Sequence, residues 1–160
     1  TTCSSRNCNN YSRWYYIIKM SKQTIKKLNY PAKILLAWKE AIGGNVELRK
    51  YLLKSEYKEL GVFCFALLND EKSRNWLFKN DFAHLLALIH GVEGKEDAWL
   101  WLKKNGFETL FHMARGGDSY KESLLWLKRK DKLLYALALQ MEKIKDEIDE
   151  RNNDPHKISP

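Results

Sequence analysis

The sequence predicts an all-α fold: an α/α superhelix, or solenoid, of short helical hairpins with a long C-terminal capping helix. The first observation behind this prediction is a fixed spacing of 25 residues between four aromatic–leucine pairs, Tyr51-Leu52, Trp76-Leu77, Trp101-Leu102 and Trp126-Leu127. The second is that other apolar positions keep the same spacing, among them Tyr57, Phe82 and Phe107, and Leu60, Leu85 and Leu110. A period of this size indicates structural repeats that bury their apolar faces against one another.

Residues 95–118 illustrate the hairpin expected in each repeat. Glu96-Asp97 open the first helix and Lys103-Lys104 close it, which suits the helix dipole at both ends. Asn105-Gly106 then favours the left-handed backbone of a helix stop. The apolar residues of a second helix follow with the spacing of one helix face: Phe107, Leu110, Phe111 and Ala114. Helices of about two to three turns do not persist alone in water, so neighbouring hairpins must share their apolar faces.

The repeated apolar positions form the predicted structural core. Equivalent residues of stacked repeats should occupy equivalent environments, because each repeat contacts its neighbours in the same way. This reasoning assigns nine residues to the core: Tyr51, Trp76, Trp101, Trp126, Phe82, Phe107, Leu60, Leu85 and Leu110.

The period also predicts the organisation of the chain. Residues 20–150 are expected to form a single solenoid domain, with a half-repeat at 30–44 and repeats at 45–69, 70–94, 95–119 and 120–150. The last repeat lacks the Asn-Gly stop, and no Gly or Pro occurs from Leu133 to Glu150, so it should end in one long helix. Residues 151–160 are expected to form a polar tail.

The first nineteen residues differ from the rest. They show no helical period, and they precede Met20-Ser21-Lys22-Gln23, which looks like an ordinary protein start. We interpret residues 1–19 as a leader translated from upstream sequence, with Met20 as the true initiator; the alternative is a genuine, poorly ordered arm. The apolar stretch Ile17-Ile18 is too short for a secretory signal.

Charge and cysteine content limit the possible environments. The net charge is +8, but residues 1–44 hold eight Lys or Arg against Glu40 alone, so the repeats are close to neutral. The chain contains no run of about 18 apolar residues, and we therefore expect no membrane span. The cysteines are Cys3, Cys8 and Cys64, an odd number without a second pair for a zinc site. A cytoplasmic protein fits this pattern best.

The hairpin pattern resembles the α-solenoid class. Over about residues 30–157 the short period makes the chain similar to small uncharacterised bacterial repeat proteins. The Trp-Leu-x-Lys-Asn stretches at 76–80 and 101–105 resemble the end of an ankyrin second helix. The period is wrong for ankyrin, and the Thr-Pro-Leu-His opening of that repeat is absent. The resemblance implies a fold and no activity.

The sequence contains no catalytic or metal-binding signature. The histidines at 84, 90, 112 and 156 form no His-Glu-x-x-His, Ser/His/Asp or Cys/His pattern, and we expect structural or surface roles for them. The carboxylates between Asp146 and Asp154 lack the spacing and the glycine of a calcium loop. The sequence therefore predicts neither an enzyme, nor a cofactor, nor a metal.

The most suggestive surface feature is a set of cations that we call the basic column: Lys54, Lys79, Lys104 and Arg129. They occupy the same place in successive repeats, so a solenoid could align them for an acidic peptide or a phosphate backbone. Alternatively, they only neutralise the negative end of the first helix of each repeat. Aromatic residues do not obviously interleave with the column, which argues against single-strand binding. We expect a non-catalytic protein–protein interaction or scaffold module, with nucleic-acid or acidic-ligand binding as the alternative.

Overall fold

The computed structural model describes residues 29–154. The predicted leader at 1–19 and residues 155–160 of the predicted tail lie outside this part of the chain. Within it, 79% of the residues are helical and no strand occurs, so the predicted all-α, solenoid-like fold with a long C-terminal helix is confirmed. Nine helices follow one another: α2 (Ala32–Ile42), α3 (Val46–Lys54), α4 (Lys58–Leu67), α5 (Glu71–Lys79), α6 (Ala83–Val92), α7 (Glu96–Lys104), α8 (Glu108–Gly117), α9 (Lys121–Lys130) and α10 (Lys132–Asn152).

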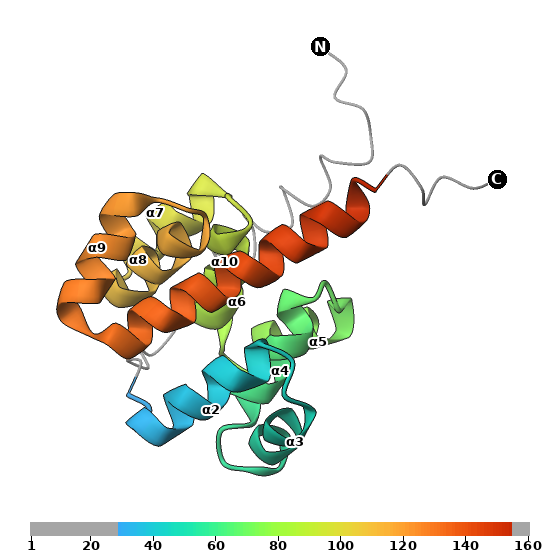
Figure 1. Cartoon of the computed structure of the whole chain (residues 1–160). Helices are drawn as coiled ribbons and strands as arrows, with labels where there is room; N and C mark the ends of the chain where they lie inside the picture. The colour runs from blue at the N-terminus through green and yellow to red at the C-terminus, as the bar shows by residue number, and fades with distance from the viewer. Residues whose placement is uncertain (1–28, 155–160) are drawn as a thin grey trace.

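The helices fall into two sets by their contacts, and Figure 1 labels the members of each set. We call α2, α4, α6, α8 and α10 the inner helices, because each packs against the next one in this series. The outer helices α3, α5, α7 and α9 each pack against the inner helices that precede and follow them in the chain. This alternation is what a stack of helical hairpins requires, since each hairpin buries its inner face against its neighbours.

The long helix α10 closes the arrangement. It packs against α8 and α9 of its own end of the chain, and also against α2, the first helix described. Figure 1 shows α10 (red) crossing in front of α6, with α8 on one side of it and α2 on the other. Its C-terminal half reaches the ends of α4 and α6, where Leu67, Val92 and Ile148 line one small cavity. The five inner helices therefore form a closed series of contacts, which a simple open solenoid does not have.

Left-handed backbone recurs with the period of the sequence at the turns from inner to outer helices. Gly44, Asn69, Gly94 and Ser119 stand 25 residues apart, and all have positive φ angles, of 108°, 69°, 84° and 70°. Glycine adopts this conformation without steric cost and asparagine tolerates it, whereas serine does so less readily. The geometry of the repeat thus requires a positive φ angle at this position even where the residue is not a glycine.

The leucine of each aromatic–leucine pair is buried in every repeat. Leu52, Leu77, Leu102 and Leu127 are all fully buried. Of the other predicted core residues, Leu60, Leu85, Leu110, Trp101 and Phe107 are buried, and Trp76, Phe82 and Trp126 are half-buried.

Tyr51 does not lie in the core, contrary to the sequence pattern, because 52% of its surface is exposed. In the next two repeats the aromatic residue stacks on the ring six residues later, at 5.9 Å for both Trp76–Phe82 and Trp101–Phe107. The equivalent ring in the first repeat is Tyr57, which packs edge-on against Tyr30 instead.

A second repeated contact joins the outer helices α3, α5 and α7 to the inner helix that precedes each of them. Arg49 and Arg74 donate through Nε to the carbonyl oxygens of Ala41 and Ala66, at 2.8 and 2.9 Å. Trp99 Nε1 donates to the Gly91 carbonyl at 2.8 Å, so an indole does in the third repeat what a guanidinium does in the first two. Each donor satisfies a carbonyl in the last turn of a helix, where intrahelical partners are lacking.

Gly91→Ala should destabilise the protein, although alanine is the better helix former. A methyl group at position 91 would lie 2.5 Å from the Ala114 Cβ and 2.9 Å from the Trp99 ring. Overpacking of this kind costs about 1–3 kcal/mol, which exceeds the gain in helix propensity. Denaturant unfolding of the variant measures the loss, and an unchanged midpoint would show that α6 and α8 do not approach each other this closely.

Candidate functional site

The turns from outer to inner helices lie along one edge of the molecule, which we call the turn edge. Contacts between successive turns establish this: Lys58 lies over the Trp76 ring, His84 stacks on Phe107 at 5.3 Å, and Lys130 donates to Thr109 Oγ1 at 3.0 Å. Outer helices end at this edge and inner helices begin there.

The basic column lies on the turn edge. Lys54, Lys79 and Lys104 are the last residues of α3, α5 and α7, and Arg129 is the penultimate residue of α9. All four are exposed, and none forms an ion pair with another residue in the part of the chain that is described. Their charges are therefore available to a partner, while each also stands near the negative end of a helix dipole.

Aromatic rings lie beneath other lysines near the basic column, although not beneath its four members. Lys58, Lys103, Lys128 and Lys130 lie over the rings of Trp76, Phe111, Tyr135 and Trp126, at 4.5–5.8 Å from the ring centroids. Trp76 also stacks on Phe82, and Trp126 stacks on His112 at 4.0 Å. These rings are thus already engaged within the protein, and a nucleic-acid base would have to displace those contacts in order to stack on them.

The edge where inner helices end carries a different polar cluster. Arg74 donates to Glu93 and to Asn69, while Lys95 Nζ lies 2.9 Å from His90 Nδ1 and 3.5 Å from a Glu93 oxygen. Burial by itself would raise the pKa of Glu93, but hydrogen bonds from His90 and Arg74 lower this pKa to about 2. Burial lowers the pKa of His90, and its hydrogen bond to Glu93 offsets this in part. The cluster joins α5 to the α6–α7 connection.

Acid should weaken the protein in two steps through this cluster. The folded pKa of His90 lies below its ordinary value of 6.5, so its contribution is present above pH 6.5 and is lost as the pH falls below that value. Glu93 contributes above pH 4.5 and loses this contribution as the pH falls toward 2. Urea unfolding at a series of pH values measures both steps. His90→Gln should remove the upper step and, because it takes away the His90 hydrogen bond to Glu93, make the lower step smaller.

One serine–histidine pair comes together that the sequence did not reveal. His112 Nδ1 lies 3.0 Å from Ser123 Oγ, between α8 and α9. Ser123 is fully buried, and among residues 29–154 no carboxylate is hydrogen-bonded to His112. Because a nucleophile must be open to its substrate and its base must be oriented by a third group, the pair fits a packing role. The stack of His112 on Trp126 agrees with that role.

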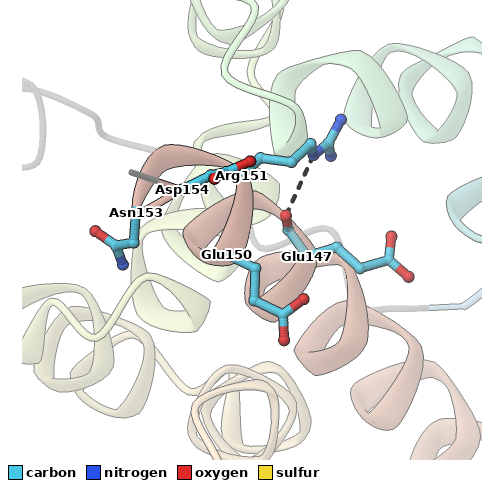
Figure 2. Close-up of a pocket in the computed structure, with 5 residues that line it drawn as sticks. All are labelled: Glu147, Glu150, Arg151, Asn153 and Asp154. Carbon is cyan, nitrogen blue, oxygen red and sulfur yellow. Dashed lines mark hydrogen bonds between the residues drawn. The ribbon is translucent and has the colours of Figure 1, made fainter. Parts of the chain in front are cut away.

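The other sequence candidates show no assembled chemistry in the described residues. The Cys64 thiol is buried and donates to the Leu60 carbonyl, and burial raises its pKa to about 12, so it is a poor nucleophile. Within residues 29–154 no group of three His, Cys, Asp or Glu side chains could hold a metal ion. Figure 2 shows the shallow depression at the end of α10, where the Glu147 and Glu150 side chains point in different directions.

One cleft on the turn edge combines polar and apolar walls. It has a volume of about 470 Å³ and lies where the α7–α8 and α9–α10 turns meet the start of α2. Phe107, Leu110 and Leu134 contribute buried apolar surface, and Lys130 and Asp131 stand at the rim. No pattern in the sequence predicts this cleft, because it arises from the contact between α10 and α2.

Comparisons with known proteins supply no relative. No protein-family model, no curated protein and no solved structure matches the chain. The helices described between residues 29 and 154 include none with both the length and the apolar content needed to cross a membrane.

Proposed function

We propose that the protein is a non-catalytic helical-repeat module that binds another protein through the turn edge. The observation that carries this proposal is the basic column, four exposed cations without an ion pair in the described chain, repeated at equivalent helix ends. The groove that an open solenoid would offer is instead occupied by α10. The turn edge is then the repeated surface that remains open to a partner of opposite charge.

A scaffold role follows from the same features. The helices are held by a continuous core from Ile34 to Ile144, so the column is presented on a rigid support. Rigid presentation reduces the entropy cost of binding, which is how repeat proteins recognise extended partners. We place this module in the cytoplasm and among short-period bacterial repeat proteins, as the cysteine content and the repeat pattern suggest.

Nucleic acid is the second candidate partner. The net charge of +8 favours it, and a phosphate backbone would also complement the basic column. Glu56, Asp81 and Asp131 follow members of the column in the sequence and argue against nucleic acid, because their carboxylates would repel a continuous chain of phosphates.

A fourfold charge reversal tests the proposal. The variant Lys54→Glu, Lys79→Glu, Lys104→Glu, Arg129→Glu should keep its fold, because surface substitutions cost little. Proteins that co-purify with the wild-type chain from native lysate should no longer co-purify with the variant. Nuclease treatment of the wild-type complexes should leave these proteins bound. Loss on nuclease treatment would instead identify nucleic acid, and complexes that survive the reversal would contradict any role for the column.

A further inference from the structure

The positive charge of the turn edge is not evenly distributed. In the equivalent segments 53–59 and 78–84, three cations (Lys54, Lys58 and Lys79) are matched by three carboxylates (Glu56, Glu59 and Asp81). In segments 103–109 and 128–134, six cations stand against two carboxylates: Lys103, Lys104, Lys128, Arg129, Lys130 and Lys132 against Glu108 and Asp131. An acidic partner should therefore be drawn to the last two turns rather than evenly along the column.

The cleft lies at these same two turns. Its walls come from Gly106–Leu110, from Lys130-Asp131 and from Leu134, with Tyr30 and Leu35 of the opposite chain end across from them. The charged residues that line the cleft are Lys130, Glu108 and Asp131, and each of the other five cations of these two segments lies within three residues of a lining residue in the sequence. A volume of about 470 Å³ lies within the range of small-molecule and side-chain pockets.

Hydrogen bonds hold the polar groups around the cleft in place. Lys130 Nζ donates to Thr109 Oγ1 at 3.0 Å, which fixes the ammonium group between the two turns. The Asp131 carboxylate accepts from the Leu133 backbone N–H at 2.7 Å, so it serves as the cap of α10. The Tyr30 hydroxyl donates to the buried Glu59 at 2.9 Å, which secures the opposite wall. A pre-organised site of this kind loses little entropy on binding.

We propose that this cleft docks an acidic polypeptide segment, which places an apolar side chain on the floor while its carboxylates face the cations of the last two turns. The inference rests on the proposed function and narrows it to one site and one partner chemistry. A polypeptide fits better than a nucleic acid, because the Phe107 ring of the apolar floor already stacks on Trp101 and His84 and is not free to stack on a base. The partner's apolar residue would supply affinity, and its carboxylates would supply orientation and rate of association.

Two matched double variants of the full chain test the inference. Lys104→Glu with Arg129→Glu reverses the column beside the cleft, and Lys54→Glu with Lys79→Glu makes the same charge change at the equivalent positions of the first two repeats. The probes are a random copolymer of glutamate and tyrosine, polyglutamate alone, and single-stranded and duplex DNA oligonucleotides. Binding is followed by amide chemical shifts in two-dimensional NMR spectra, which also report whether each variant is folded.

We expect the glutamate–tyrosine copolymer to shift the amides of Gly106, Thr109, Lys130 and Leu134. The Lys104/Arg129 variant should bind it at least about tenfold more weakly, and the Lys54/Lys79 variant should change affinity by less than about threefold. Polyglutamate should bind more weakly than the copolymer, because it lacks the apolar side chain.

Four results would overturn the inference. The first is that both double variants weaken binding of the glutamate–tyrosine copolymer equally. The second and third are that polyglutamate binds as tightly as the copolymer, or that either DNA binds more tightly than it. The fourth is that the copolymer shifts no amide around the cleft. Equal weakening would still leave the proposed function standing, with the whole column as its surface. The proposed function fails separately, when complexes of the wild-type chain survive the fourfold reversal.

Discussion

Trp101→Ala should lower the free energy of unfolding by about 3–5 kcal/mol, the range for removing a large aromatic side chain from a core. Trp101 is buried, and its ring stacks on Phe107 at 5.9 Å with an interplanar angle of 16°. Because α7 packs on both α6 and α8, the cavity would weaken two interfaces together. Denaturant unfolding followed by far-UV circular dichroism should show one cooperative transition at a lower midpoint.

Tyr51→Ala is the matched control for this prediction. It removes the aromatic residue at the same repeat position, but 52% of Tyr51 is exposed. We expect a change within about 0.5 kcal/mol, as is usual for surface substitutions. Similar losses for the two variants would mean that the difference in burial between the first and third repeats is not real. Two separate transitions for Trp101→Ala would mean that the repeats do not unfold together.

Arg74→Ala should destabilise the protein by about 3 kcal/mol, the lower end of the range for breaking a buried ion pair. The Arg74 side chain is 11% exposed and that of Glu93 is 26% exposed. The substitution leaves Glu93 without its guanidinium partner and the Ala66 carbonyl with only the Asn69 backbone N–H as a donor. Urea unfolding at neutral pH measures the loss, and the loss should shrink as Glu93 becomes protonated in acid.

Two other variants separate the contributions of Arg74. Arg49→Ala removes the equivalent bond to the Ala41 carbonyl without breaking an ion pair, and should cost about 1 kcal/mol. Lys50→Ala breaks the exposed pair with Glu47 and should cost less than about 0.5 kcal/mol. If Arg74→Ala costs no more than Arg49→Ala, the pair with Glu93 contributes nothing to stability.

The local structure could be predicted from the sequence, because apolar residues recur at the 25-residue spacing of the repeats. Each aromatic–leucine pair marks an outer helix, and Asn105-Gly106 marks a turn, where Gly106 has the expected positive φ angle of 80°. The left-handed residues Asn69 and Ser119 were missed, since neither residue type requires that conformation. The donors to the inner-helix carbonyls were also missed, because Arg74 and Trp99 share a role without sharing a residue type.

The long-range contacts could not be predicted from a repeating pattern. A period describes how each repeat meets the next, but it carries no information on whether the first and last helices meet. The packing of α10 on α2, and the cleft that it creates between Leu35 and Leu134, therefore appear only in the structure. The same holds for Tyr51, whose exposure depends on the orientation of Tyr57 toward Tyr30.

Closure of the inner helices by α10 is the feature on which the cleft depends, and proton–proton NOE spectra of the full chain test it most directly. We expect NOEs between the Gly43 α protons and the Gln140 side chain, which approach each other where α2 meets α10. The NOE between Val92 and Gly117 is the internal control, because it reports packing of neighbouring repeats alone. A spectrum with the control NOE but without the NOE between Gly43 and Gln140 would contradict closure and show an open solenoid.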